Sequence, residues 1–441
     1  MKTKLDFIGG DTRRCLLTMA LPMMAAMLLN LMYNLVDSLW IGNLLGETAY
    51  AALTNAAPVI LLLTSVAMGA TNGVSILLSQ AIGAGDRGQT ERLIATSFCL
   101  AAGFALLATA LLEAFLPAIL RALRTPAETF AMAYSYLAVY LLGYLAVSLY
   151  LYFTAVLRSF GDSLFQAAAM LVSTLLNAVL DPIFIHFLGF QGAAIATLLS
   201  QALCLLFMLL YLRRKKLFPL RLSAFDGREV LPLLQKAIPS VIQQSIPAVS
   251  TTFLTALVSG WGVTAIAAYG VAGKLETVLF YPAMALNMVL TAIIGQCVGG
   301  GRYDRAKDYL RCALGCGCGL LALLSALVVG FSRQLSGLFL PSDAAAAIVG
   351  TYFRVVSVGY LLNMVTNCCL GALNGMGRPG RSMLLMAFYY LAVRMPLAYL
   401  LSRLGFGLNG IWAAVLVSHV VAAAAAAALA GRAIPKSADR R

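Results

Sequence analysis

Residues 79–85 read Ser-Gln-Ala-Ile-Gly-Ala-Gly, and residues 295–301 read Gly-Gln-Cys-Val-Gly-Gly-Gly, so a glutamine and two glycines recur at an offset of 216 residues. The same offset relates four further pairs of identical residues, namely Leu157 and Leu373, Gly161 and Gly377, Thr48 and Thr264, and Ala52 and Ala268. Gly192 finds its counterpart at Gly410, at an offset of 218. A nearly constant offset over several regions predicts that the chain contains two copies of one structural repeat.

The apolar composition predicts that this repeat lies in a membrane. Hydrophobic residues make up 61% of the 441 residues and charged residues only 11%, which is too apolar for a soluble domain of this length. Apolar runs of about 20 residues, each long enough to cross a bilayer as a helix, recur along the whole chain. We expect an all-α polytopic protein with twelve transmembrane helices at residues 15–37, 49–78, 93–113, 130–157, 164–187, 190–212, 237–259, 263–295, 310–331, 347–373, 383–403 and 407–430.

These spans divide into two lobes. We predict an N-terminal lobe at 1–212, a cytoplasmic linker at 213–236, a C-terminal lobe at 237–430 and a cytoplasmic tail at 431–441. Because six spans per repeat is an even number, both copies have the same orientation and are related by an axis along the membrane normal.

The basic residues predict the orientation. If both termini are cytoplasmic, 24 of the 31 Lys and Arg residues lie in the tails and loops on the cytoplasmic side. This bias also accounts for the net charge of +14, so we expect no nucleic-acid partner.

Charged residues inside the spans are candidates for function, because a buried ionisable group is costly unless it is paired or hydrated. Asp37 and Asp181 each lie roughly 35 Å along their helices from the basic residues at the cytoplasmic side, and hence at matching depth. Asn177 lies one turn from Asp181 on the same face, Pro182 frees a backbone carbonyl, and Thr197 would add a hydroxyl. These oxygens would bind Na⁺ at Asp37, Asn177 and Asp181, or the carboxylates would take up a proton. Alternatively, Asp37 is merely interfacial and Asp181 with Pro182 merely ends a helix.

The second half offers candidates for a substrate cavity. Glu276 forms either a structural ion pair across helices or part of a binding site, and Arg394 and His419 are interpreted as structural. Aromatic, thioether and polar side chains would line a cavity for flat organic cations. The residues predicted for this cavity are Tyr33, Gln244, Lys274, Glu276, Tyr281 and Met284.

Several motifs together resemble the multidrug and toxic compound extrusion (MATE) family: Val-Asp-Ser-Leu-Trp-Ile-Gly at 36–42, the loop at 80–85, Arg-Ser-Phe-Gly-Asp at 158–162, Asn-Ala-Val-Leu-Asp-Pro at 177–182 and Gly-Ala-Ala-Ile-Ala-Thr at 192–197. The resemblance implies two six-helix lobes in a V shape. It also implies alternating access, with export of organic cations or drugs in exchange for Na⁺ or H⁺. The family's first-lobe cation site would fall on Asp37, Asn177, Asp181 and Thr197. The predicted spans 237–259 and 347–373 contain no acidic residue that would form the second-lobe site of NorM-like members, so the chain looks DinF-like.

Two other functions compete with export. A lipid or lipid-linked saccharide flippase would share the lobe architecture, but its anionic head groups would call for more basic residues in the cavity than Lys274 and Arg394. A membrane-embedded enzyme would need a nucleophile elbow or a His-based metal motif, which the sequence lacks. We therefore expect a monomeric transporter without a cofactor, surrounded by lipid in the bacterial cytoplasmic membrane.

Overall fold

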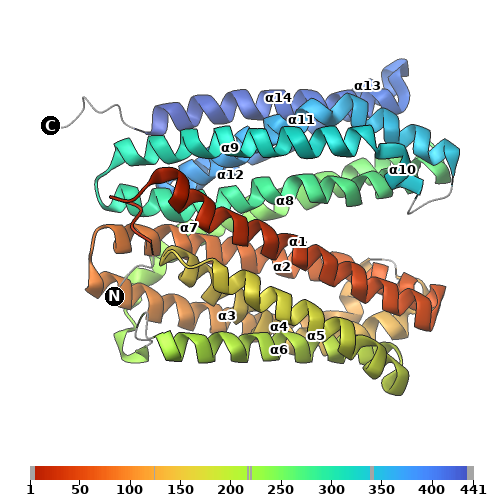
Figure 1. Ribbon diagram of the computed structural model, residues 1–441. Coiled ribbons are helices and arrows are strands. Elements are labelled where there is room, and N and C mark those ends of the chain that lie inside the picture. The colour runs from red at the N-terminus through yellow and green to blue at the C-terminus, as the bar shows by residue number, and fades with distance from the viewer. Residues whose placement is uncertain (1–4, 124, 216–217, 219–220, 338–341, 435–441) are drawn as a thin grey trace. The chain divides into compact units, whose positions relative to one another are not determined.

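The computed structural model describes residues 5–123, 125–215, 218, 221–337 and 342–434, and this part of the chain is helical and contains no strand (Figure 1). The α-helices are α1 Thr12–Leu45, α2 Glu47–Gly83, α3 Arg87–Ala122, α4 Ala127–Ser159, α5 Leu164–Leu188, α6 Phe190–Lys215, α7 Val230–Ser259, α8 Val263–Gly299, α9 Tyr303–Gly330, α10 Ser332–Gly337, α11 Asp343–Gly375, α12 Pro379–Ala387, α13 Met395–Leu401 and α14 Gly407–Ala433. Short 3₁₀ helices lie at η1 Leu222–Ala224 and η2 Gly227–Glu229, and π-helices at η3 Phe388–Arg394 and η4 Ser402–Phe406.

The long helices confirm the predicted fold class. Eleven segments of the described chain are long and apolar enough to cross a membrane, and the last of them, Pro379–Ala433, contains two predicted spans. Gly405 and Gly407 divide this segment with φ angles of 91° and 56°, a left-handed conformation that glycine adopts without strain. Most helices extend beyond the predicted spans, because hydropathy marks the apolar centre of a helix and not its polar end turns.

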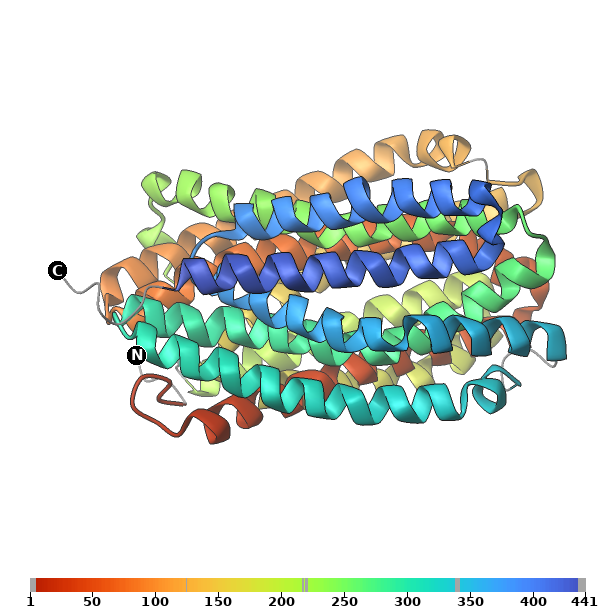
Figure 2. The same cartoon turned by 90° about the horizontal axis from the view of Figure 1, so that it is seen from above.

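The described residues divide into two compact units. Unit 1 contains Leu21–Ala237 together with the chain up to Asp6, and unit 2 contains Phe7–Ala20 and Ile238–Arg441. Within unit 2, helices α8, α9, α11 and α14 lie lengthwise beside one another in both views (Figure 1, Figure 2).

Packing inside the units follows the predicted repeat. In unit 1, α4 packs against α2 and α6, and in unit 2, α11 packs against α8 and α14. Glycines with positive φ recur in pairs at the offset read from the sequence: Gly46 with Gly262, Gly85 with Gly301, Gly161 with Gly377, and Gly189 with Gly407. The internal repeat is therefore present in the backbone as well as in the sequence.

The turn between α2 and α3 shows how these glycines act. Gly85 has a φ of 72°, which ends α2 within two residues. Asp86 then caps α3 by accepting a hydrogen bond from the Gln89 backbone N–H at 2.9 Å. Gly85 thus ends one helix immediately before the next begins.

Residues Phe7–Ala20 near the N-terminus belong to unit 2. The Phe7 ring is buried and meets the Tyr309 ring edge-on at 6.4 Å. Arg305 donates hydrogen bonds to the Thr12 hydroxyl at 2.9 Å and to the Gly10 carbonyl. Helix α1 therefore begins in unit 2 and continues in unit 1 from Leu21, one residue before Pro22.

Part of the predicted linker packs on unit 1. The Asp226 backbone N–H donates to the Thr96 hydroxyl at 3.0 Å, and Arg92 lies 3.6 Å from Glu229 and 3.8 Å from Asp226. Residues 216, 217, 219 and 220 of this linker lie outside the described residues.

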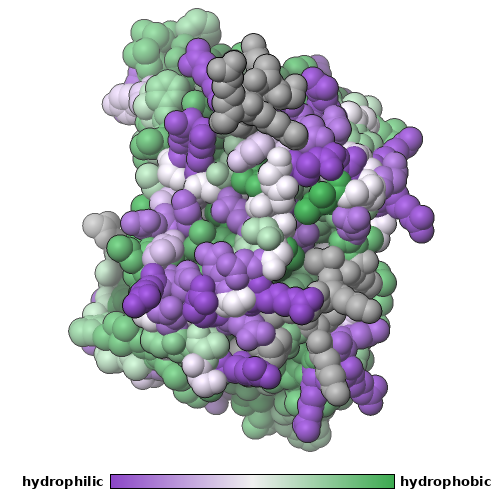
Figure 3. Space-filling view, turned by 90° about the vertical axis from the view of Figure 1, so that its left-hand side faces the viewer, coloured by the Kyte–Doolittle hydropathy of each residue, from purple (hydrophilic) through white to green (hydrophobic). Residues whose placement is uncertain are grey.

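Each unit has a polar end. Figure 3 shows hydrophilic side chains gathered at the end of unit 1 that carries the turn between α2 and α3, and at the end of unit 2 that carries the turn between α8 and α9. Large apolar side chains along the helices are exposed, among them Phe187 at 76% and Val263 at 84%. Such apolar exposure fits a protein whose sides face lipid.

Candidate functional site

Two acidic side chains of unit 1 are buried between helices α1 and α5. Asp37 of α1 is 7% exposed and Asp181 of α5 is 0% exposed. Their carboxyl groups lie close enough to interact directly with each other. The structure therefore brings together the two carboxylates that the depth argument paired.

Asn177 positions Asp181. The two residues are one turn apart on α5, and the Asn177 Nδ2 donates a hydrogen bond to Asp181 Oδ1 at 2.8 Å. Because the amide nitrogen is used in this way, the amide oxygen of Asn177 remains free for another partner. Pro182 follows within the same helix, so the carbonyl of Ala178 lacks its usual backbone donor.

Four oxygens of this cluster are buried without a hydrogen-bond partner in the structure. They are Asp37 Oδ1, Asn177 Oδ1, Asp181 Oδ2 and Thr197 Oγ1, one from each residue predicted for the cation site. A buried oxygen without a partner costs about 1–3 kcal/mol, and more when it is charged. Four of them at one place indicate that a group outside the protein chain completes their coordination.

Two residues beside this cluster were not assigned to it from the sequence. The Tyr33 hydroxyl, from the turn of α1 before Asp37, lies 3.0 Å from the Ser200 hydroxyl of α6. Tyr33 was predicted for the substrate cavity and Ser200 was not predicted at all. The spacing of three residues from Thr197 to Ser200, on one helix face, was a signal that would have found it.

The kinds of oxygen in this cluster indicate which ions it can bind. Carboxylate, amide and hydroxyl oxygens suit a hard cation, and two carboxylates can instead share a proton. In the part of the chain that the structure describes, no group of three or more His, Cys, Asp or Glu residues is placed to hold a metal ion. The cluster thus has the chemistry of a Na⁺ or proton site, and it lacks the third acidic, histidine or cysteine ligand typical of tight divalent-metal sites.

The residues predicted for the cavity in unit 2 differ in how deeply they are buried. Gln244, Tyr281 and Met284 are half-buried, while Lys274 is exposed. Their role in a cavity stays a prediction.

Of the two roles predicted for Glu276, the structural ion pair is wrong. Its Oε1 atom accepts hydrogen bonds from the hydroxyls of Tyr352 at 2.5 Å and Tyr360 at 2.9 Å, both on α11. No Lys or Arg nitrogen of the described chain forms an ion pair with it. Two tyrosine hydroxyls replace the cation because α8 packs along α11, which the sequence could not reveal.

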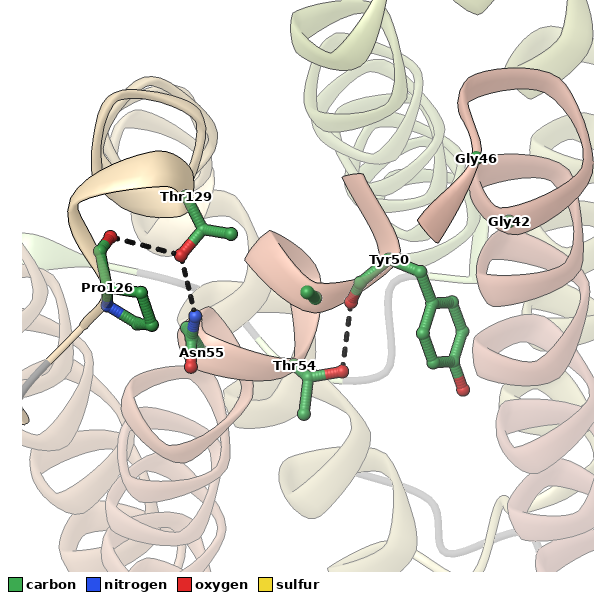
Figure 4. A pocket seen from close by; sticks show the side chains of 8 residues that line it. Gly42, Gly46, Tyr50, Thr54, Asn55, Pro126 and Thr129 are labelled. Carbon is green, nitrogen blue, oxygen red and sulfur yellow. Dashed lines mark hydrogen bonds between the residues drawn. The ribbon is translucent and has the colours of Figure 1, made fainter. Parts of the chain in front are cut away.

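A separate cavity of about 530 Å³ lies in unit 1 at the turn between α1 and α2. Figure 4 shows the Asn55 amide directed at the Thr129 hydroxyl, with a hydrogen bond of 3.0 Å between them, and the Tyr50 ring at the opposite side. The cavity has no charged side chain in its lining and contains none of the predicted site residues.

Comparison with known proteins identifies this arrangement. The sequence pattern of the MatE family matches residues 22–183 and 239–400, which covers both repeats and most of the chain. The chain belongs to the MatE family. The two matched regions each contain one copy of the repeat, so the MatE pattern and the internal repeat agree.

Known proteins resemble the chain over nearly its whole length. It is 27% identical over 432 residues to the probable multidrug resistance protein YpnP of Bacillus subtilis, covering 96% of this chain and 95% of YpnP. It is 28% identical over 446 residues to an FAD transporter of Shewanella oneidensis, covering 98% and 97%. A solved MATE multidrug-resistance transporter in its outward-facing conformation superposes with a TM-score of 0.92 at 25% identity and covers 98% of both chains. This chain is therefore a multi-pass membrane protein of a bacterial transporter family.

Proposed function

We propose that the protein exports small organic molecules through the membrane in exchange for Na⁺ or H⁺, and that the ion binds in unit 1 at Asp37, Asn177, Asp181 and Thr197. The observation that carries this proposal is the set of four buried oxygens without a hydrogen-bond partner, one on each of these residues. Relatives described as multidrug resistance proteins support drugs and organic cations as the cargo.

The inward movement of one ion releases enough free energy to drive export of the cargo. One charge moving inward across about 100 mV releases about 2.3 kcal/mol, which supports a cargo gradient of nearly fifty-fold. Alternating access follows if the cluster, once neutralised by an ion, favours a different arrangement of the helices than the ion-free cluster. The two carboxylates repel each other when no ion is present, and this difference biases the two states.

We also propose a DinF-like subtype for the transporter and a membrane orientation with both termini in the cytoplasm. Both carboxylates of the site lie in unit 1, which supports a DinF-like mechanism in preference to a NorM-like one. The concentration of Lys and Arg in the tails and in one set of loops supports cytoplasmic termini in the bacterial inner membrane. Reporter fusions at the C-terminus measure this orientation directly.

The test is efflux from proteoliposomes. Purified protein is reconstituted, a fluorescent organic cation is loaded, and a Na⁺ gradient or a pH gradient is imposed separately. We expect one gradient to drive efflux, and Asp37→Asn and Asp181→Asn to reduce that efflux to the level of protein-free vesicles. Glu128→Gln, an exposed carboxylate in the first turn of α4, is the matched control. Undiminished efflux in both aspartate variants would remove unit 1 from the mechanism.

A further inference from the structure

Unit 2 contains a cluster of polar side chains that the proposed ion coupling does not use. Glu276 comes from α8, Tyr352 and Tyr360 from α11, Arg394 from the end of η3, and His419 from α14. Arg394 and His419 are 7% and 1% exposed. The cluster places one carboxylate and one guanidinium in the interior of the unit.

The carboxylate of Glu276 is only half satisfied. Tyr352 and Tyr360 both donate to Oε1, and no described residue forms a hydrogen bond with Oε2. Glu276 is half-buried, and Oε2 is not fully enclosed. The two tyrosines fix the carboxylate with its second oxygen open.

The guanidinium of Arg394 is also held with one group open. Its Nε donates to the Ser418 hydroxyl at 2.8 Å, and its Nη2 lies 3.1 Å from His419 Nε2. Since a guanidinium only donates hydrogen bonds, His419 Nε2 must accept, and Nη1 is left without a partner among the described residues. The Tyr390 ring lies 4.4 Å beneath the guanidinium carbon and holds its plane.

Glu276 and Arg394 do not pair with each other. Their charges interact, yet no nitrogen of Arg394 lies within 4.0 Å of a Glu276 oxygen. Opposite charges in a low-dielectric interior normally close to direct contact, because each then compensates the desolvation of the other. Here the two charges stay apart, and each keeps one hydrogen-bonding atom that no other described residue uses.

Aromatic rings pack against the residues of this cluster. Tyr269 stacks on Trp412 at 5.6 Å, and Tyr352 meets Trp412 edge-on at 4.7 Å. Phe280 lies 5.8 Å from Tyr360 and 6.3 Å from the His419 ring. Flat aromatic molecules bind favourably against such rings, by stacking and by edge-to-face contact.

The backbone that carries Arg394 is unusual. Residues Phe388–Arg394 form a π-helix, a rare conformation that occurs mostly at functional sites. Pro396 follows within the next turn and cannot donate a backbone hydrogen bond.

We propose that this cluster binds a planar aromatic zwitterion, with the cationic group of the ligand at Glu276 Oε2 and its anionic group at Arg394 Nη1. The proposal rests on the proposed transport function and names a cargo class for it. A ligand with only one of the two charges would leave either the carboxylate or the guanidinium without a partner, which costs binding energy.

The test uses three indole compounds that differ only in their charged groups. Tryptophan carries both charges, tryptamine lacks the carboxylate, and indole-3-propionate lacks the ammonium group. Binding to the purified full chain in detergent is measured by calorimetry without any ion gradient, so failure of ion coupling would leave the result unchanged. We expect tryptophan to bind about tenfold more tightly than either single-charge compound, since each missing group loses one charge-assisted hydrogen bond.

Two variants separate the two ends of the ligand. Arg394→Gln should abolish the preference for tryptophan over tryptamine, and Glu276→Gln should abolish the preference over indole-3-propionate. Arg394→Lys, which keeps the charge, guards against misfolding of the first variant and should retain most of its preference, and thermal unfolding checks each protein. Equal affinity for the three compounds, absence of tryptophan binding, or preferences unchanged in folded variants would each overturn the proposal.

Discussion

The two units differ in the charged side chains that their interiors hold. In unit 1, Asp181 directly precedes Pro182 of α5, and Ser200 of α6 bonds to Tyr33 beside the carboxylates. In unit 2, Arg394 lies two residues before Pro396, and Ser418, at the offset of 218 from Ser200, accepts from Arg394. The repeat thus keeps its turns and helix packing, while unit 1 holds two carboxylates and unit 2 holds one carboxylate, Glu276, together with the guanidinium of Arg394. One fold can therefore present different ionisable groups in its two copies.

The largest effect, on stability, should come from glycines at close helix contacts, of which each unit has one at a corresponding position. A Cβ on Gly192 would lie 2.1 Å from the Phe184 carbonyl oxygen, whereas one on Gly410 would lie 2.9 Å from Leu401 atoms. We expect Gly192→Ala to destabilise the protein by more than about 3 kcal/mol and Gly410→Ala by less, because the overlap at Gly192 is closer and involves only backbone atoms.

Thermal unfolding in detergent measures this difference. Gly103→Ala in α3 is the control, since a Cβ there meets no atom within 4 Å. Equal unfolding temperatures for Gly192→Ala and Gly103→Ala would contradict the packing described for α5 and α6.

The second-largest effect, on ion affinity, is expected at Asn177, whose amide donates to Asp181. Asn177→Leu keeps the volume and removes both the donor to Asp181 and the amide oxygen. We expect the affinity for the coupling ion to fall by at least about tenfold, because a buried carboxylate loses its partner. Ser418→Ala, which removes a hydrogen bond from Arg394 in unit 2, should leave ion affinity unchanged. An ion affinity that responds to Ser418→Ala and not to Asn177→Leu would reverse the assignment of the units.

A smaller effect should follow from making unit 1 resemble unit 2 at one position. Thr197 corresponds to Val415 at the offset of 218. Thr197→Val retains the shape and removes one buried oxygen without a partner. We expect about three- to tenfold weaker ion binding, equivalent to roughly 1 kcal/mol for one hydrogen-bonding group, as measured by ion titration of transport. Unchanged binding would exclude the Thr197 hydroxyl from the site.

The smallest effect should come from the tyrosine beside the site. Tyr33→Phe removes the hydrogen bond to Ser200 and should lower stability by about 1 kcal/mol while the coupling ion still binds. Tyr134→Phe, at an exposed hydroxyl of α4, is the control and should unfold like the unaltered protein. Loss of ion binding in Tyr33→Phe would instead make the hydroxyl a ligand.

The sequence predicted features that depend on periodicity and spacing. Twelve apolar spans, the repeat offset and the pairing of Asn177 with Asp181 all follow from positions along single helices, and the structure contains each of them. The grouping of Asp37 with Asp181 also came from spacing, because distance along a helix translates into depth in a bilayer.

Features that depend on contacts between distant segments were not predictable. The tyrosines that bind Glu276 lie 76 and 84 residues away from it. The placement of Phe7–Ala20 in unit 2 depends on Arg305 and Tyr309, nearly 300 residues later, and hydropathy gives no indication of it. The π-helix before Arg394 was equally hidden, since its residues have the composition of any apolar helix.

The central claim, that the coupling ion binds in unit 1, is tested most directly by measuring ion binding itself. Na⁺ is titrated into the purified protein by calorimetry, and proton uptake is followed with an indicator dye, for the unaltered chain, Asp181→Asn and Glu276→Gln. We predict that the unaltered chain and Glu276→Gln bind the ion and that Asp181→Asn binds none. Binding that persists in Asp181→Asn and disappears in Glu276→Gln would contradict the account.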